Sequence, residues 1–499
     1  MARNKGNPTS ASSPNGTDPR SLCRRSALKG LAAAAVSPIL GRASRAQDQP
    51  LPKLPTFGSR EALLLRPSDR GYALYQPAYN ARVVLRPRLR VLCKTAKAVA
   101  TMVDWARGNG LAFALRSGGH SYEGFSQSAD IVIDTRLMNA ITYDAAAKTM
   151  IVGAGATLRP IYEKIGAAGF GFPGGSCPSV GIAGHALGGG YGLIARAYGL
   201  ACDNLEWVQL VDAQASIIEA DANHNPDLFW ACRGGGGGSF GAVTQFRFRI
   251  HKIARVLTLG VTWDLPLGRA AKLMSAWQAW APQAPPAMTV FLRVSGLSNS
   301  KIRLHAAGQS VGSEAELRGA LQHLFDVERS VAAPRIRSRS FIQAARDFFG
   351  GADLPYSKAK SDYVTSPLTD EGISTLLRGL QQAPTVTAIC DSYGGAITGV
   401  ADDATAFSHR TGTLFCIQYV SSWETANQTA GRLAQIRNLH AAMRPYVSGG
   451  AYVNYCDLDL DRNVWPQAYW GKNLGRLQQI KARIDPDNVF HHAQSVALS

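Results

Sequence analysis

Apolar residues recur at helical and strand-like spacings along most of the chain. Within residues 95–106, Val99 and Val103 have the four-residue spacing that places side chains on one face of a helix. A Gly-Asn-Gly sequence then predicts the end of this helix. Residues 111–115 alternate as a strand does. The loop after this strand therefore lies at a strand end, where ligand-binding groups often occur.

The same spacings predict further elements in the rest of the chain. Residues 205–211 and 216–220 flank a polar turn, which predicts a β-hairpin. An amphipathic pattern near the C-terminus ends at an Asp-Pro pair and predicts a helix. The other predicted elements are strands at 83–85, at 243–250 and at 413–419, two strands around a turn within 131–152, and helices at 157–166, 227–232, 270–280 and 473–484.

The composition is that of a folded protein with more than one domain. The chain has 499 residues, of which 46% are hydrophobic and 18% are charged, and chains of this length usually divide into domains. The eight cysteines include no Cys-x-x-Cys pair and no zinc-type Cys/His spacing, so no metal site is predicted.

The net charge of +18 does not by itself indicate nucleic-acid binding. The first 46 residues carry eight Lys or Arg and one acidic residue, so +7 belongs to this segment and +11 to the remainder. Beyond it the basic residues are scattered singly, without the basic stripe of a nucleic-acid interface. We expect a solvated basic surface and no nucleic-acid partner.

The N-terminal 46 residues have the pattern of a targeting segment. Arg24 and Arg25 precede a mildly apolar stretch at 27–40, and small residues suitable for cleavage follow. This order resembles a twin-arginine signal, which predicts a periplasmic or secreted protein. The apolar stretch is too short to cross a bilayer stably, so we expect no membrane span.

Three glycine-rich segments predict a large cofactor that bears phosphate. They lie at 117–121, 174–181 and 233–241. Glycine permits positive φ and lacks a Cβ, so backbone N–H groups can approach a diphosphate closely. A Gly-Ala-Gly sequence at 153–155 begins like a Rossmann turn, but Leu158 stands where the third glycine belongs, and a tight turn is the better interpretation.

Several motifs together resemble the FAD domain of the vanillyl-alcohol-oxidase/PCMH superfamily, in its berberine-bridge-enzyme-like branch. They are Arg-Ser-Gly-Gly-His-Ser-Tyr at 116–122, Cys177 with the glycine-rich sequence at 181–192, Tyr-Gly-Leu-Ala-Cys-Asp-Asn at 198–204, and C-terminal sequences at 452–459, 469–473 and 485–490. The resemblance implies an α+β fold. It has a PCMH-type FAD-binding domain of two α+β subdomains and a substrate domain with an antiparallel sheet covered by helices.

The resemblance also implies how the chain divides and where the cofactor binds. The expected segments are a signal at 1–46, an entry segment at 47–75, the FAD domain at 76–253, the substrate domain at 254–450 and a C-terminal segment at 451–499 that returns to the FAD domain. FAD is expected to be bound covalently twice, through a ring nitrogen of His120 and the sulfur of Cys177. The other implied cofactor-binding residues are Arg116, Ser117, Gly118, Gly119, Ser121, Gly175, Val180, Gly181, Gly184, His185, Gly188, Gly189, Gly190, Gly192, Gly238, Gly241, Val243, Asn454 and Tyr455.

The family pattern points to a tyrosine as the base that takes the substrate proton. Tyr455 is the expected base, and a phenol needs a partner or the flavin to lower its pKa for this role. Tyr452, Tyr393 and Gln418 are expected to orient or polarise the substrate, although packing in the core is an equally good interpretation of Tyr393 and Gln418. The small side chain of Val180 is expected to admit O₂ to the flavin.

The resulting functional hypothesis is an exported FAD-dependent oxidase. It would take hydride from a carbon that bears a hydroxyl group, in a sugar, an oligosaccharide or a secondary-metabolite alcohol, and reduce O₂ to H₂O₂. Oxidative cyclisation or dehydrogenation of a secondary metabolite with another acceptor is the alternative. A non-catalytic flavin-binding protein is disfavoured because His120, Cys177 and Tyr455 are all present. The substrate and the oligomeric state do not follow from the sequence.

Overall fold

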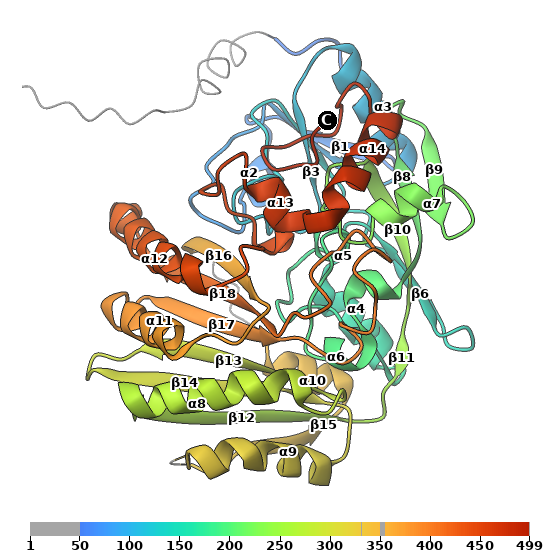
Figure 1. The fold of residues 1–499 in the computed structure, drawn as a ribbon. Coiled ribbons are helices and arrows are strands. Elements are labelled where there is room, and N and C mark those ends of the chain that lie inside the picture. The colour runs from blue at the N-terminus through green and yellow to red at the C-terminus, as the bar shows by residue number, and fades with distance from the viewer. Residues whose placement is uncertain (1–49, 331, 350–354, 499) are drawn as a thin grey trace, which may run out of the picture. The chain divides into compact units, whose positions relative to one another are not determined.

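The computed structural model describes residues 50–330, 332–349 and 355–498 (Figure 1). Near the N-terminus it contains β1 (Ala62–Leu65), α2 (Tyr72–Tyr75), β2 (Leu89–Cys93), α3 (Ala96–Gly108), β3 (Phe113–Arg116) and β4 (Ile131–Asp134). The strands form a sheet in the order β1-β2-β4-β3, in which only β1 is antiparallel to its neighbour. Every side chain of β2 is buried, as is typical of a strand covered on both faces.

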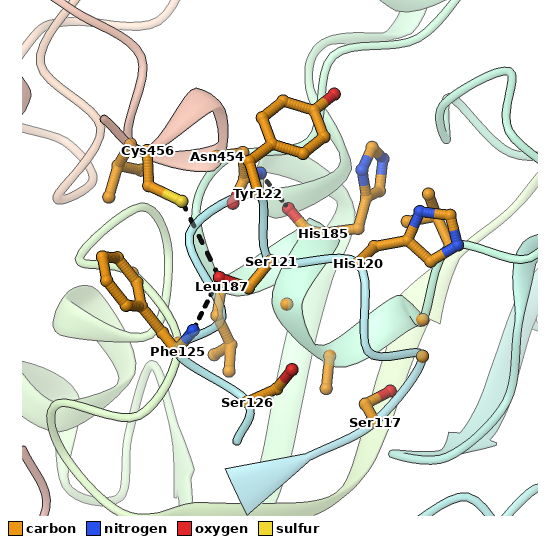
Figure 2. A pocket seen from close by; sticks show the side chains of 18 of the residues that line it. Ser117, His120, Ser121, Tyr122, Phe125, Ser126, His185, Leu187, Asn454 and Cys456 are labelled. Carbon is orange, nitrogen blue, oxygen red and sulfur yellow. Dashed lines mark hydrogen bonds between the residues drawn. The ribbon is translucent and has the colours of Figure 1, made fainter. Parts of the chain in front are cut away.

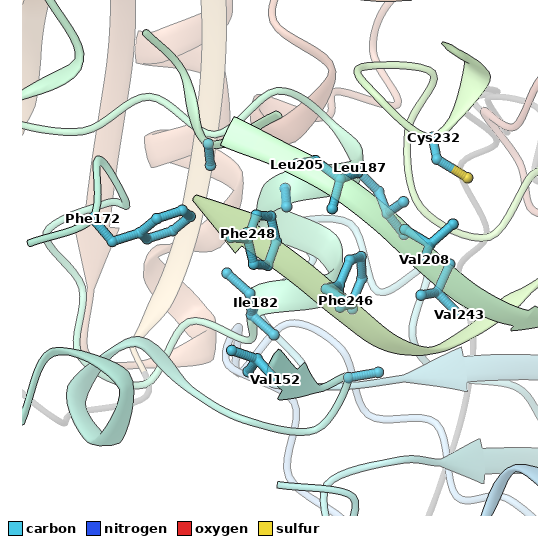
Figure 3. Close-up of a cluster of buried hydrophobic side chains, with 14 of the residues drawn as sticks. Val152, Phe172, Ile182, Leu187, Leu205, Val208, Cys232, Val243, Phe246 and Phe248 are labelled. Atoms are coloured by element: carbon cyan, nitrogen blue, oxygen red, sulfur yellow. The ribbon is translucent and has the colours of Figure 1, made fainter. Parts of the chain in front are cut away.

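A second sheet is antiparallel and contributes most of the strands to the hydrophobic core between residues 141 and 253. In spatial order it contains β5 (Ile141–Asp144), β6 (Thr149–Gly153), β10 (Ala242–Arg249), β8 (Leu205–Val211) and β9 (Ile217–Asp221). Figure 3 shows Phe246 and Phe248 of β10 beside Phe172, Ile182 and Val208, all fully buried. Four helices lie between the strands of this sheet in the sequence, namely α4 (Leu158–Gly166), α5 (Ile182–Leu187), α6 (Ala195–Tyr198) and α7 (Pro226–Ala231). A pair of short strands, β7 (Phe170–Gly171) and β11 (His251–Lys252), adjoins the sheet.

The third sheet has seven antiparallel strands. In spatial order they are β15 (Arg335–Arg339), β12 (Val256–Pro266), β14 (Lys301–Ser310), β13 (Met288–Gly296), β17 (Val386–Ser392), β18 (Phe415–Trp423) and β16 (Tyr356–Val364). Apolar side chains of this sheet form one hydrophobic core with four helices, which are α8 (Leu267–Trp280), α9 (Glu314–Val327), α11 (Asp370–Gln382) and α12 (Thr429–Met443). A further helix, α10 (Phe341–Asp347), packs against α4 (Figure 1). Because side chains alternate along a strand, the opposite face is free to form a binding surface.

The C-terminal segment packs against the core of the second sheet. It contains α13 (Trp465–Trp470) and α14 (Leu474–Ile484), drawn in red beside the blue and green elements in Figure 1. The buried Lys481 Nζ lies 2.6 Å from Asp485 Oδ2 and also donates to the carbonyl oxygens of Ser239 and Phe490. A buried charge pair is tolerated where its remaining hydrogen bonds are satisfied, as they are here. These bonds join the C-terminal segment to the glycine-rich loop before β10.

Most predicted elements occur within a few residues of their expected bounds, but the strand at 83–85 is wrong. These residues are not in a strand, and the Val84 side chain is 76% exposed. The strand β2 begins instead after Pro87, which has no N–H to donate to a sheet. Within the described residues no helix is both long and apolar enough to cross a membrane. The signal at 1–46 lies outside the described residues, and the predicted domain limits stay a prediction.

Candidate active site

A cavity of about 420 Å³ lies between the glycine-rich loops and the seven-stranded sheet. Its wall is formed by the loop after β3, the segment leading into α5, the loop before β10 and the C-terminal segment, with β13, β17 and β18 on the opposite side. Figure 2 shows side chains from several of these segments around it. Every predicted site residue lines this cavity except Gly188, Gly189, Gly190 and Tyr393.

His120 is held in a defined orientation on the cavity wall. Its ring stacks on Tyr79 with centroids 3.9 Å apart, and its Nε2 lies 3.0 Å from Ser179 Oγ. Burial, with a further contribution from the Arg116 guanidinium, lowers the pKa of His120 to about 4. The imidazole is therefore neutral at pH 7, and a neutral ring keeps the lone pair that a nucleophile needs.

Cys177 lies on the neighbouring loop and lines the same cavity. Burial raises the pKa of its thiol, and the charge of Arg293 opposes this. Ser179, which contacts His120, is only two residues away from Cys177. Gly118 and Gly181 bring the two loops together, because a Cβ on Gly118 would overlap the backbone nitrogen of Gly181. The close approach of these loops therefore requires glycine at both positions.

Four glycines, Gly184, Gly236, Gly237 and Gly238, lie close together on the cavity wall. A Cβ on Gly184 would meet no atom within 4 Å, and the nearest atom to a Cβ on Gly237 is the Cα of Gly184, at 3.7 Å. Gly236 and Gly238 have positive φ values of 89° and 80°. A side chain on Gly184 would enter open space, whereas one on Gly236 or Gly238 would also strain the backbone. This is the arrangement expected where a flat ligand lies against bare backbone.

Arg116 lines one end of the cavity and belongs to a positively charged cluster whose other members, Arg90 and Arg136, lie outside the wall. Arg90, Arg116 and Arg136 all pair with the single carboxylate of Asp134. The Nε and Nη1 atoms of Arg116 are buried and have no hydrogen-bond partner among the described residues. Buried guanidinium groups with spare donors favour an anion such as phosphate.

His185, Tyr452 and Asn454 hold the loops in place. The N–H of Gly175 donates to His185 Nε2 at 3.0 Å, and burial lowers the pKa of His185 to about 4, which keeps this nitrogen an acceptor. Asn454 Nδ2 donates to the carbonyl oxygen of His185 at 3.0 Å (Figure 2) and to the Tyr452 hydroxyl at 2.9 Å. The Tyr452 oxygen also accepts from the N–H of Gly190 at 2.8 Å. These bonds attach the C-terminal segment to α5.

Tyr455 and Asp391 form a hydrogen-bonded pair inside the cavity. The Tyr455 hydroxyl donates to Asp391 Oδ2 at 3.2 Å, and both residues line the wall. Burial raises the pKa of Asp391 to about 7, against the lowering effects of this hydrogen bond and of Arg293. Burial and the nearby Asp391 charge raise the pKa of Tyr455 well above its usual value. The carboxylate, rather than a tyrosinate, is therefore the group that can accept a proton near neutral pH.

Gln418 and Tyr393, two of the three predicted helper residues, lie in different places. Gln418 lines the cavity, and its Nε2 donates to the Tyr122 hydroxyl at 3.1 Å. The ring of Tyr122 is nearly parallel to that of Tyr455, with centroids 6.0 Å apart. Tyr393 is fully buried outside the wall, where it stacks on Tyr191. Of the two open interpretations, core packing is the one that the position of Tyr393 favours.

The three glycines outside the wall make close packing contacts behind it. A Cβ on Gly188 would overlap the side-chain amide of Asn454. One on Gly189 would come within 2.7 Å of the Phe407 ring, and one on Gly190 within 2.6 Å of the Ala201 side chain. These positions shape the end of α5, and a direct contact with a cofactor stays a prediction for them.

Comparisons with known proteins extend over nearly the whole described chain. Residues 87–221 match the model of the FAD binding domain, and residues 451–497 match that of berberine and berberine-like proteins. An uncharacterized FAD-linked oxidoreductase of Bacillus subtilis is 33% identical over 437 residues, which is 86% of this chain and 95% of that protein. The chain belongs to the berberine-bridge-enzyme-like family of FAD-linked oxidoreductases.

Solved structures agree with this family and with the predicted α+β fold. BBE-like 1 of Physcomitrella patens has a TM-score of 0.80 at 32% identity and covers 88% of this chain and 97% of its own. Berberine bridge enzyme of Eschscholzia californica has a TM-score of 0.81 at 28% identity, with the same two coverages. The PCMH-type fold expected from the sequence is thereby confirmed, and the chain is an enzyme of this family.

The cavity of this berberine-bridge-like enzyme fits FAD. The backbone at Gly184, Gly236 and Gly237 leaves room for a flat ring system, and the spare donors of Arg116 suit an anionic part of the cofactor. His120 and Cys177 line the same wall and supply the nitrogen and the sulfur that could form covalent bonds. The binding of FAD therefore follows from both the family and the chemistry of the wall.

The sequence missed Asp391 as a site residue. Nothing in the local sequence distinguishes Asp391 from a buried aspartate at a strand end, although it stands two residues before Tyr393, a predicted site residue. Its place in the site comes from the pairing of β13 with β17, which sets Asp391 opposite Phe291 on the cavity side of the sheet. A signal for it could have come only from knowing this register.

Proposed function

We propose that this protein is an FAD-dependent oxidase that acts on a carbon bearing a hydroxyl group. The observation that carries the proposal is the Tyr455–Asp391 hydrogen bond within the FAD cavity. Oxidation of an alcohol removes a hydride from carbon and a proton from oxygen, so the site needs a group that takes the proton. Bound FAD would supply the hydride acceptor, and O₂ would reoxidise it with release of H₂O₂.

The proton would pass through Tyr455 to Asp391. The substrate hydroxyl donates to the Tyr455 oxygen, while the Tyr455 hydroxyl gives its own proton to Asp391 Oδ2. Since Asp391 has a pKa of about 7, its carboxylate is unprotonated in about half of the molecules at neutral pH and can accept a proton there. Tyr455 then stays neutral throughout, which agrees with its raised pKa. Gln418 and Tyr122, joined by a hydrogen bond beside Tyr455, would orient the substrate hydroxyl.

His120 and Cys177 are proposed to hold FAD through two covalent bonds. In support, the His120 ring is neutral and oriented by Tyr79 and Ser179, and Cys177 lies on the loop that carries Ser179. Two bonds would fix the ring system without a binding equilibrium and would raise its potential as an oxidant. Val180 lines the cavity three residues after Cys177, and its small side chain supports access for O₂.

Export through the twin-arginine pathway is part of the same proposal. Arg24 and Arg25 precede the apolar stretch at 27–40 in the sequence. This route carries folded proteins, so FAD could be attached before export. The enzyme would then act on substrates in the periplasm or outside the cell.

The decisive experiment is a visible spectrum of the purified protein before and after acid precipitation. Wild type and the single variants His120→Ala and Cys177→Ala should keep their yellow colour in the pellet, and the double variant should release it. A screen of alcohols and sugars should then bleach the flavin without air and yield H₂O₂ in air. Flavin in the wild-type supernatant would refute covalent attachment, and a flavin that no hydroxyl compound bleaches would refute the oxidase.

A further inference from the structure

Arg293 projects from the seven-stranded sheet into the substrate side of the cavity. It lies on β13, two residues from Phe291, and its strand partner on β17 is Ile389. Phe291, Arg293, Ile389 and Asp391 all line the cavity, as the alternation of side chains along two paired strands requires. Although it lies on this wall, Arg293 is exposed. Its guanidinium group is thus available to a molecule that enters the cavity.

No carboxylate among the described residues forms an ion pair with Arg293. Its guanidinium carbon lies over the face of the Phe291 ring, 5.4 Å from the ring centroid. Arg303, on the same face of the neighbouring strand, provides the contrast, because its guanidinium makes two 2.7 Å bonds to Asp264. A free guanidinium group beside an apolar wall binds a carboxylate well, since its planar donors match the two oxygens.

The positive charge of Arg293 influences groups on both the cofactor side and the proton-accepting side of the cavity. It lowers the pKa of Cys177, on the cofactor side, and that of Asp391, on the proton-accepting side. Arg293 and Asp391 lie on the same face of two paired strands, so a substrate whose hydroxyl reaches Tyr455, which is bonded to Asp391, lies near this cation. The neighbouring wall is apolar and is formed by Leu193, Phe291, Phe348 and Ile389.

We propose, building on the proposed function, that Arg293 binds a carboxylate of the substrate and that the preferred substrates are acidic hydroxy compounds. The apolar wall would pack against the carbon skeleton, while Tyr455 and Asp391 receive the hydroxyl proton. The positive charge of the protein as a whole agrees with an anionic substrate, because it raises the rate at which anions approach. The carboxylate thus determines which hydroxyl compound is selected.

The test compares each acid with its own methyl ester, which keeps the shape and removes the charge. Suitable pairs are D-galacturonic acid with methyl D-galacturonate, and 4-(hydroxymethyl)benzoic acid with its methyl ester. In the holoenzyme, binding without oxygen is measured by calorimetry and turnover by H₂O₂ release. For at least one pair we expect the acid to be preferred over the ester by about 10- to 100-fold, and Arg293→Gln to remove this preference.

The variants separate a binding role from other roles. Arg293→Lys should keep part of the preference, and Arg303→Gln, which alters an arginine that is already paired, should keep all of it. Equal binding of acid and ester by wild type would overturn the proposal. The proposal would also be overturned if Arg293→Gln reduced binding and turnover of the acid and the ester equally, since this would mean that Arg293 acts on Asp391 or the flavin. If an acid binds through Arg293 but neither member of a pair bleaches the flavin, the oxidase proposal fails while the carboxylate site stands.

Discussion

Replacement of Asp391 by asparagine should impair catalysis and stabilise the protein at the same time. Asp391 is buried, and its pKa of about 7 lies about 3 units above the ordinary value of 3.8. Each unit corresponds to about 1.4 kcal/mol, so the ionised side chain costs about 4 kcal/mol of folding free energy above pH 7. Asparagine has nearly the same shape and can still accept the hydrogen bond from Tyr455, but it carries no charge.

The stabilisation should depend on pH in a defined direction. Because the folded-state pKa is raised, the cost is fully present above pH 7. It decreases as pH falls from about 7 and is nearly gone at about 4, below which the carboxyl group becomes neutral in both folded and unfolded chains. For a folded unit of about 450 residues, an unfolding entropy of about 1 kcal/mol per kelvin converts this cost into a Tm increase of about 4 °C. The increase should be present at pH 8 and absent at pH 4.

Activity should fall in the same variant. The loss of the proton acceptor should lower kcat by about 10²- to 10⁴-fold and remove the decrease in kcat that we expect of wild type as pH falls below 7. Melting curves at pH 4, 6 and 8 and pH–rate profiles of both proteins provide the measurements. A variant with wild-type kcat would show that Asp391 accepts no proton. A Tm that drops at pH 8 would show that the carboxylate stabilises the fold, contrary to the reasoning from its burial.

Three further predictions concern two glycine positions and export. Gly118→Ala should lower both Tm and FAD content, because its Cβ would overlap Gly181, whereas Gly184→Leu should lower FAD content with little change in Tm, because its side chain would enter open space. The ratio of flavin to protein absorbance measures FAD content, and melting curves measure Tm, in each glycine variant. A Gly184→Leu variant with full FAD content would contradict the proposed cofactor position. Replacement of Arg24 and Arg25 by lysine should keep the protein inside the cell, as immunoblots of cell fractions would reveal. Unchanged export would exclude the twin-arginine route.

Local patterns were sufficient to predict most helices and strands, because each rests on the periodicity of its own residues. The helix predicted at 270–280 occurs as α8, whose Leu273, Met274 and Trp277 are buried. The failure at 83–85 has a local cause, since three apolar residues before Pro87 show no alternation that would distinguish a strand from an exposed segment. The buried β2, just past this proline, was not predicted.

The sequence alone determined the family, the fold class and the loops around the FAD cavity. These depend on motifs in which glycine, histidine and cysteine follow one another closely, so their chemistry can be read from neighbouring positions. Only the tertiary structure decided which distant groups act together. The register of β13 and β17 brings Asp391 and Arg293 into one cavity, and the C-terminal segment adds Tyr455. Burial in that cavity, which no local pattern records, raises the pKa of Asp391 to near neutrality and makes it a proton acceptor.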